Sequence, residues 1–473
     1  MKRRDFVTCA GAMLCQAMMP GLRAQTQGTS AKADITLRIA PVALEIAPSH
    51  FISTIGYNGT SPGPILRMKE GKTVTVDVIN DTDAAEFVHW HGLLIPAAVD
   101  GAEEEGTPPV PAGGRRRYQF TPKPAGTRWY HSHAMSMGDL HRGTYTGQYG
   151  FLMIDSGTDP GHYDQEIFIA LRDWEPFYTD QFVDMDEAGA PPGPQPEKPA
   201  RLDTRANGLE AISQVYSIND KALGTGPPIR VRQGTRLLVH LLNASALGNQ
   251  TIALPGHEFH VLALDGNAVP TPGPARVITL GPGERVDAYV EMNRPGVWIL
   301  GSVDDMIRSA GLGVVIEYAS QHREPQWVPQ PGVFWDYTRF GKAQAGSGKA
   351  PPHVIDMIFE KVPGGARPYN LWTINGKPYP HEREFVLQEG QRYRINFRNR
   401  TDDSHPVHLH RHVFELVDVN GKPTSGIMKD TVVVPLYGRV SVDLVADQPG
   451  LSLFHCHMQA HMDYGFKALF RYA

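Results

Sequence analysis

The stretch YNGTSPGPILRMKEGKTVTVDVIN, residues 57–80, joins a turn-rich first half to a strand-like second half. Gly71 lies nine residues before Asn80, and apolar and polar side chains alternate between them. Such alternation predicts a β-strand with one buried face, and the Gly and Pro residues before it predict turns. The stretch therefore favours β-structure.

The same pattern occurs twice more along the chain. Residues 216–243 read YSINDKALGTGPPIRVRQGTRLLVHLLN, and residues 373–399 read TINGKPYPHEREFVLQEGQRYRINFRN. In both, a glycine again precedes an asparagine by nine residues. The spacing between copies is about one domain, which indicates a chain built from repeats of one folding unit.

A second triplet closes each copy of the unit: AGTRWYHSH (125–133), PGVWILGSV (295–303) and PGLSLFHCH (449–457). Each places a turn glycine five residues before an equivalent position, which holds His131, Gly301 or His455. The middle copy therefore lacks the histidine that the outer two carry.

The short alternating runs, broken by Gly and Pro, predict an all-β fold of three Greek-key β-sandwich domains. We expect these domains at residues 34–156, 163–320 and 352–473. Residues 190–199, APPGPQPEKP, are expected to form an exposed loop, and residues 342–352 a linker into the third domain.

The first 24 residues are expected to be an export signal and not part of the fold. Arg3 and Arg4 precede an apolar run that ends in a small-residue site at Ala24. The arginine pair followed by Asp5 and Phe6 resembles the twin-arginine type, with an ordinary secretion signal as the alternative. No later apolar run reaches the ~18 residues of a membrane span, so we expect a periplasmic or secreted protein without a membrane anchor.

Charge and cysteine content limit the possible functions. The formal charge of -5 provides no basic field for nucleic acid. Removal of the signal leaves Cys456 as the single cysteine. A single cysteine cannot form an internal disulfide in an oxidising compartment, so it is an incidental core residue or a functional thiol.

Histidine is concentrated in four short clusters. Of the 20 histidines, ten fall in HWHG (89–92), HSH (131–133), HPVHLH (405–410) and HCHMQAH (455–461). One HxH pair commonly arises by chance on a strand. Four clusters at matched ends of a repeated fold instead indicate metal binding.

The ligand types indicate copper. Cys456, His405 and His461 supply one thiolate and two imidazoles, which is the blue-copper arrangement, whereas structural zinc prefers four closed ligands. On an extended strand Cys456 points to one face while its two neighbouring histidines point to the other. The remaining eight histidines are enough for three further coppers between the first and third domains, a centre suited to reduction of O2 to water.

These four motifs, in this order, resemble the copper signatures of the three-domain, laccase-type multicopper oxidases, and the likeness covers essentially the whole mature sequence. It implies three cupredoxin-like domains, four copper ions, a small-molecule reductant and O2 as partners, and a monomer. It also implies that His405, Cys456 and His461 bind the type 1 copper, His89 and His408 the type 2 copper, His91, His131 and His457 one type 3 copper, and His133, His410 and His455 the other.

Several positions depart from that family's pattern or stay open. Phe466 stands where many bacterial relatives carry an axial methionine, and an apolar axial neighbour that does not bind the metal is associated with a higher potential. Asp100 lies where relatives carry an acid near the three-copper site and could relay protons to oxygen. His412 aligns with His257 of the copper-free middle domain, which favours a structural role.

Other side chains give weaker signals. Met462 follows the last copper histidine, where some relatives place a glutamate, with Asp463 next. Met135, Met137 and His141 could hold Cu(I), but they are more typical of an ordinary loop.

Other classes and reductants stay open at this point. A copper nitrite reductase shares the fold but resembles two domains per chain, and a copper-free structural relative in the cell envelope would have lost ligands. Phenols or aromatic amines are the expected reductants, with cuprous ion in copper tolerance as the alternative.

Overall fold

The computed structural model describes residues 32–157, 161–180, 208–319, 321, 323–342, 351–364, 368–380 and 384–473. The predicted signal at 1–24, the Pro-rich loop at 190–199 and most of the 342–352 linker lie outside the described residues. Among the described residues, the helices are all too short or too polar to cross a membrane.

The first domain contains two four-stranded sheets, in the orders β2-β1-β4-β6 and β3-β8-β7-β5. Strand β4, which ends the repeat at Asn80, alternates strictly between buried and partly buried side chains, as the sequence predicted. The strands are β1 (Ile35–Ala47), β2 (His50–Tyr57), β3 (Leu66–Lys69), β4 (Val74–Asn80), β5 (Val88–His91), β6 (Arg115–Phe120), β7 (Gly126–Ser132) and β8 (Tyr149–Asp155).

The second domain has a six-stranded sheet, β10-β9-β12-β17-β14-β15, and a five-stranded sheet, β11-β19-β18-β13-β16. Its strands are β9 (Gln165–Thr179), β10 (Glu210–Ile218), β11 (Ile229–Val231), β12 (Arg236–Asn243), β13 (Gln250–Ala253), β14 (Phe259–Leu264), β15 (Asn267–Ala275), β16 (Val277–Leu280), β17 (Arg285–Glu291), β18 (Val297–Ser302) and β19 (Gly313–Tyr318).

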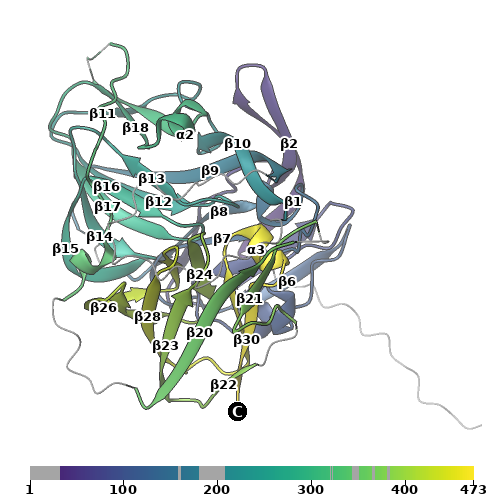
Figure 1. Cartoon of the computed structure of the whole chain (residues 1–473). Helices are drawn as coiled ribbons and strands as arrows, with labels where there is room; N and C mark the ends of the chain where they lie inside the picture. Colours follow the sequence, from purple (N-terminus) through teal and green to yellow (C-terminus); the bar gives the residue numbers. More distant parts are fainter. Residues whose placement is uncertain are drawn as a thin grey trace, which may run out of the picture.

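The third domain repeats that topology strand for strand, as β21-β20-β23-β28-β25-β26 and β22-β30-β29-β24-β27. Its strands are β20 (His353–Val362), β21 (Leu371–Ile374), β22 (Phe385–Leu387), β23 (Arg392–Asn399), β24 (His405–Leu409), β25 (Phe414–Val419), β26 (Lys422–Lys429), β27 (Thr431–Val434), β28 (Arg439–Val445), β29 (Leu451–Cys456) and β30 (Lys467–Tyr472). The three predicted cupredoxin-like sandwiches are confirmed, and Figure 1 shows the third packed against the other two.

The repeated asparagine holds an equivalent loop in each domain. The amide of Asn399 donates to the carbonyls of Asp403 and Pro435, and its Oδ1 accepts from the Thr401 N–H at 2.9 Å. Asn80 and Asn243 make the same kinds of bond in their own domains. Because a buried side-chain amide satisfies several loop backbone groups at once, the asparagine fixes the loop that leads into the next strand, which in the third domain is β24.

Short helices are the other regular elements of the described chain: α1 (Ala97–Asp100), α2 (Asp305–Ser309), α3 (Gln459–Asp463), η1 (Glu103–Glu105), η2 (Gly143–Tyr145) and η3 (Tyr337–Phe340). Two of them position functional side chains. Helix α1 ends with the buried Asp100, and α3 carries His461.

A charged triplet joins the first domain to the second. His240 of β12 lies 2.7 Å from Asp287 and 3.1 Å from Glu166, and the first domain's Thr127 hydroxyl lies 3.0 Å from its ring. Burial by itself lowers the pKa of this ring. The negative charges of Asp287 and Glu166 have the larger effect and raise the pKa of His240 to about 9.

This triplet predicts a pH-dependent stability. A histidine whose pKa is raised by folding stabilises the folded state. This stabilisation is complete at pH values below the ordinary histidine pKa of 6.5, and it is lost as the pH rises to 9. The free energy of unfolding should fall by up to about 3 kcal/mol across that window. Urea unfolding of wild type and His240→Gln at both ends of the window measures it, and parallel pH profiles of the two proteins would contradict it.

Candidate metal centre

Two pairs of neighbouring strands carry the histidines of the outer domains. In the first domain β5 pairs with β7 so that His89 faces His131, and in the third β24 pairs with β29 so that His408 faces His455. Opposed residues of an antiparallel pair project from the same face of the sheet. The two strand pairs therefore present equivalent histidine-bearing faces.

These faces meet between the domains and form one buried cluster of eight histidines, here called the histidine cluster. Potential ligand atoms lie within 4.8 Å of one another in the groups His89–His91–His131, His89–His408–His410 and His133–His410–His455. His457 completes the cluster, with its ring 5.2 Å from that of His91 and 5.1 Å from that of His131. All eight predicted cluster residues are brought together.

Nearby oxygens fix the orientation of most of these rings. The Nδ1 atoms of four rings lie 2.7 to 3.0 Å from backbone carbonyls: His89 on Asp100, His131 on Ser132, His408 on Asp430 and His455 on Cys456. In His410, Nδ1 lies 2.8 Å from a carboxylate oxygen of Asp100. A carbonyl oxygen can only accept, so Nδ1 carries the proton and Nε2 presents a lone pair.

Those lone pairs converge on the interior of the cluster. The Nε2 atom of His455 lies 3.1 Å from that of His410 and 3.5 Å from that of His133, and the Nε2 atoms of His89 and His408 are 3.4 Å apart. Burial lowers the pKa of the ring of His455 to about 3, so it is neutral near pH 7. Facing lone pairs repel each other unless a cation lies among them, and neutral imidazole is a ligand that suits copper.

The orphaned nitrogens of the cluster support the same conclusion. Nδ1 of His91, Nε2 of His131 and both ring nitrogens of His457 are buried without a hydrogen-bond partner. A buried polar atom without a hydrogen-bond partner lowers the stability of the folded state. Metal coordination satisfies such atoms, so the residues present fit a group of copper ions.

A second group, here called the cysteine site, consists of Cys456, His405 and His461. The sulfur of Cys456 lies 3.8 Å from Nδ1 of His405 and 3.6 Å from Nδ1 of His461, and all three side chains are buried. The Thr401 hydroxyl lies 2.7 Å from the other nitrogen of His405. The two Nδ1 atoms thus face the sulfur, which fits one copper ion bound by a thiolate and two imidazoles.

Strand alternation explains how one tripeptide serves both sites. In the β24–β29 ladder Cys456 faces Val407, while His455 faces His408. Side chains of one parity point into the third domain's sandwich, and those of the other parity point toward the first domain. Cys456 and His405 therefore belong to the inner face, and His455, His408 and His410 to the outer face.

Aromatic side chains enclose the cysteine site. Phe466 is fully buried, and its ring centroid lies 4.8 Å from that of His405. Trp372, which no sequence motif marks, lies 3.9 Å from the ring of His461 and 5.1 Å from that of His405. The surroundings of the thiolate are thus apolar, and Phe466 cannot supply a donor atom.

Carboxylates lie directly against the histidine cluster. Asp100 is completely buried, lies 3.1 Å from Nδ1 of His89 and 2.8 Å from Nδ1 of His410, and leaves its Oδ1 without a partner. Glu105 lies 3.5 Å from the same His410 atom, and burial together with the charge of Asp100 raises the pKa of Glu105. The sequence predicted Asp100 but not Glu105, since a run of three glutamates at 103–105 is ordinarily exposed.

Asp430 links the histidine cluster to all three domains and was also missed. One of its oxygens lies 3.1 Å from Nε2 of His91, and it forms a two-point ion pair with Arg285 of the second domain at 2.6 and 2.7 Å. Arg128 of the first domain lies 3.5 Å away. Burial opposes ionisation, but Arg285 and Arg128 keep the pKa of Asp430 below its usual value.

The weaker candidates have other contacts. His412 lies 2.9 Å from the carbonyl of His410 and 2.7 Å from the Tyr472 hydroxyl, and His257 contacts a carbonyl and the Tyr318 hydroxyl in the same way. This matches the structural role predicted for His412. The sulfur of Met135 lies 3.1 Å from the Lys467 ammonium, and 47% of Met137 is exposed.

Asp100 provides a prediction about oxygen reduction. Asp100→Asn should slow reoxidation by O2 more than reduction of the cysteine site, because only the oxygen step consumes protons. Stopped-flow traces of the two half-reactions measure the difference, with copper content checked because Asp100 also orients His410. Equal slowing of both half-reactions in a fully loaded variant would exclude the relay.

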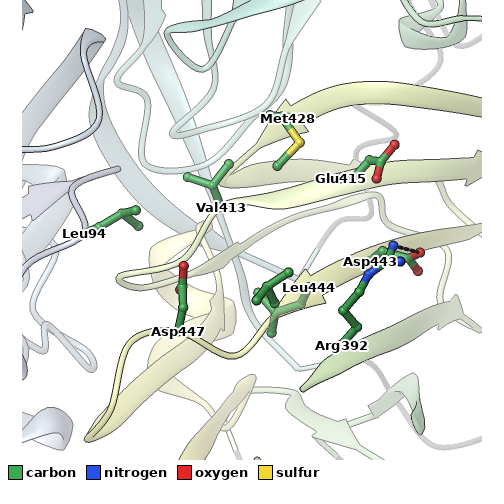
Figure 2. Close-up of a pocket in the computed structure, with 9 residues that line it drawn as sticks. Leu94, Arg392, Val413, Glu415, Met428, Asp443, Leu444 and Asp447 are labelled. Carbon is green, nitrogen blue, oxygen red and sulfur yellow. Dashed lines mark hydrogen bonds and ion pairs between the residues drawn. The ribbon is translucent and has the colours of Figure 1, made fainter. Parts of the chain in front are cut away.

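Two hollows lie in different parts of the molecule. A small one of about 10 Å³, close to the volume one water needs, is lined by His131, Ser132, His133, Thr144, His455, His457, Gln459 and Met462. A larger one of about 230 Å³ lies on the six-stranded sheet of the third domain. There Leu94 of the first domain faces Val413, and Arg392 pairs with Asp443 (Figure 2). The larger hollow has no metal-binding histidine or cysteine in its lining, so only the small one belongs to the metal centre.

Comparison with known proteins assigns the family. Multicopper oxidase profiles match residues 42–159, 168–309 and 357–473. The chain is 29% identical to multicopper oxidase MmcO of Mycobacterium tuberculosis, over 96% of this chain and 90% of that protein. It is 25% identical to laccase-2 of Botryotinia fuckeliana, over 88% and 78% of the two chains.

A solved structure shows the same architecture. The multi-copper oxidase of Pseudomonas thermotolerans superposes with a TM-score of 0.69 at 26% identity, over 93% of this chain and all of that one. Profiles, relatives and fold agree with the converging histidines and the buried thiolate. The chain therefore belongs to the multicopper oxidase family and is a laccase-like, copper-dependent oxidoreductase that uses O2 as its electron acceptor.

Proposed function

We propose that four copper ions are held as the motifs imply, one at the cysteine site and three in the histidine cluster. The converging Nε2 lone pairs and the orphaned nitrogens of His91, His131 and His457 support this assignment. Bound copper supplies one-electron oxidation at the first site and reduction of O2 at the second. The direct neighbours His455, Cys456 and His457 give electrons a short covalent path between them.

We further propose that the reductant is a phenol or an aromatic amine. The observation that carries this is the fully buried Phe466 ring, whose centroid lies 4.8 Å from that of His405. Phe466 stands where the family resemblance expects an axial donor. Copper(II) gains more than copper(I) from an extra donor, so an apolar neighbour favours the reduced metal and raises the potential. A higher potential extends oxidation to phenols that are harder to oxidise.

The test is oxygen uptake by the purified, copper-loaded protein with a graded phenol series, aromatic amines and Cu(I). Phenols are expected to be turned over faster than Cu(I). Faster turnover of Cu(I) than of any phenol would instead assign the protein to copper tolerance. A loaded protein that consumes oxygen with neither would show that the reductant belongs to another chemical class.

Phe466→Met provides the matched prediction. Adding a thioether donor should lower the reduction potential of the cysteine site and reduce turnover most for the phenols that are hardest to oxidise. A redox titration of the blue band in both proteins measures the shift, and Phe466→Leu is the apolar control. An unchanged or higher potential in the Met variant would remove Phe466 from the axial position.

We also propose a monomer that is exported through the twin-arginine route to the periplasm. One chain supplies both halves of the histidine cluster, so a second copy is not needed to complete the site. The arginine pair and apolar run before Ala24 support the route. Analytical ultracentrifugation tests whether the protein is a monomer. Fractionation of cells that carry Arg3→Lys together with Arg4→Lys tests the export route.

A further inference from the structure

Three tyrosines lie ring against ring beside the cysteine site. Tyr369 stacks on Tyr464 with ring centroids 4.4 Å apart and planes 22° from parallel, and Tyr178 lies 5.0 Å from Tyr369. They come from three separate segments: the end of β9 in the second domain, the residues before β21, and the residue after α3. All three tyrosines are half-buried, so each is partly accessible to solvent.

Tyr464 is the member of this group that connects to a ligand of the cysteine site. Tyr464 follows α3, which carries His461, and its carbonyl accepts a 3.0 Å hydrogen bond from the Trp372 N–H. The Trp372 ring in turn lies 3.9 Å from the ring of His461. Figure 1 shows α3 beside β21, the strand that begins just before Trp372.

Direct access to the cysteine site is narrow. Only 6% of His461 is exposed, and the covering Trp372 is 2% exposed. Because so little of either ring is exposed, a phenol attached to a bulky polymer is hindered from contacting His461 more than a free phenol is. Electron transfer weakens steeply with distance, but a series of rings in contact divides one long step into several short ones.

We propose that Tyr178, Tyr369 and Tyr464 relay single electrons to the cysteine site from phenolic reductants too bulky to reach His461. This inference rests on the proposed organic reductant and adds bulky, polymer-bound phenols to its range.

Each step of the relay conserves electrons and protons. Tyr464 gives one electron to the oxidised cysteine site and releases its phenolic proton, and it regains an electron and a proton from Tyr369. The Tyr369 radical is restored in the same way by Tyr178. The Tyr178 radical then takes one hydrogen atom from the bulky phenol, which leaves as a phenoxyl radical. Every tyrosine is restored, and O2 remains the final oxidant through the established activity.

Local hydrogen bonding suits this role. The Tyr178 hydroxyl donates to the Met137 carbonyl at 3.0 Å, and a side chain added at Gly138 would lie 3.2 Å from the Tyr369 hydroxyl. The loop at 137–138 therefore packs closely on the phenol oxygens and holds the rings in place.

The first test compares one phenol in two forms, free and attached to a soluble dextran. In Tyr178→Phe and Tyr369→Phe, kcat/KM for the dextran-bound form should fall at least tenfold relative to kcat/KM for the free form. Tyr289→Phe, at a half-buried tyrosine of β17, is the matched control and should leave the ratio unchanged. An unchanged ratio in both relay variants overturns the relay.

The second test does not depend on turnover. The oxidised holoenzyme is illuminated with a dextran-bound ruthenium photo-oxidant and a spin trap, and the adduct is located by peptide mass spectrometry. Adducts are expected on Tyr178, Tyr369 and Tyr464 in wild type, and the Tyr464 adduct should be lost in Tyr369→Phe. Persistence of the Tyr464 adduct in that variant contradicts the relay.

The failure of the relay and that of the proposed function can be told apart. If the free phenol is not oxidised by wild type, the proposed reductant is wrong. If the free phenol is oxidised but the ratio and the adducts do not respond to Tyr369→Phe, only the relay is wrong.

Discussion

Cys456→Ser is expected to abolish the intense blue absorption and all reductant turnover while the histidine cluster keeps its copper. The sulfur lies 3.6 and 3.8 Å from the two facing histidine nitrogens, and the hydroxyl of serine is not a soft thiolate donor. Of the eight histidines of the other site, four belong to the first domain and four project from the opposite face of the β24–β29 pair, so their geometry should persist. Optical spectra, EPR and copper content per chain measure the three outcomes together.

His412→Gln is the matched control for this prediction. His412 is also a buried third-domain histidine, but it contacts a carbonyl and the Tyr472 hydroxyl. This variant should remain blue and active. A Cys456→Ser protein that stays blue would show that the thiolate of Cys456 is not the source of the colour.

Copper removal is expected to lower the melting temperature and to loosen the first and third domains together. Without the metal, the Nε2 atoms of His410 and His455 face each other at 3.1 Å, and both ring nitrogens of His457 lack partners. A metal that binds only the folded state stabilises it by mass action, by about 4 kcal/mol when it is present at ~1,000 times its dissociation constant. Calorimetry of apo and reloaded protein measures the shift.

Hydrogen exchange tests the location of this effect. Peptides from β5 and β7 and from β24 and β29 should lose protection together, because each pair supplies half of the cluster. Peptides from β13 and β18, the equivalent strands of the second domain, provide the internal control. Equal melting of apo and holo protein, or loss of protection in one domain alone, would contradict a cluster that bridges the domains.

Local sequence determined the fold class and the chemistry of the ligands. Alternation with a period of two depends only on neighbouring residues, so it predicted the strands and also placed Cys456 and His455 on opposite faces of β29. The glycine and asparagine repeat exposed the internal symmetry, because each copy needs the same loop hydrogen bonds. Residue types then identified copper, since thiolate and imidazole are soft or borderline donors.

The tertiary structure decided which distant groups meet the metal ligands. Asp430 lies 339 residues from His91 along the chain, and Glu105 and Trp372 belong to segments whose patterns suggest only surface or core positions. It also fixed which ring nitrogen most of the cluster histidines present, since this depends on whether a carbonyl or carboxylate lies beside Nδ1. Such contacts arise only when domains pack, because no periodicity in one segment encodes the position of another.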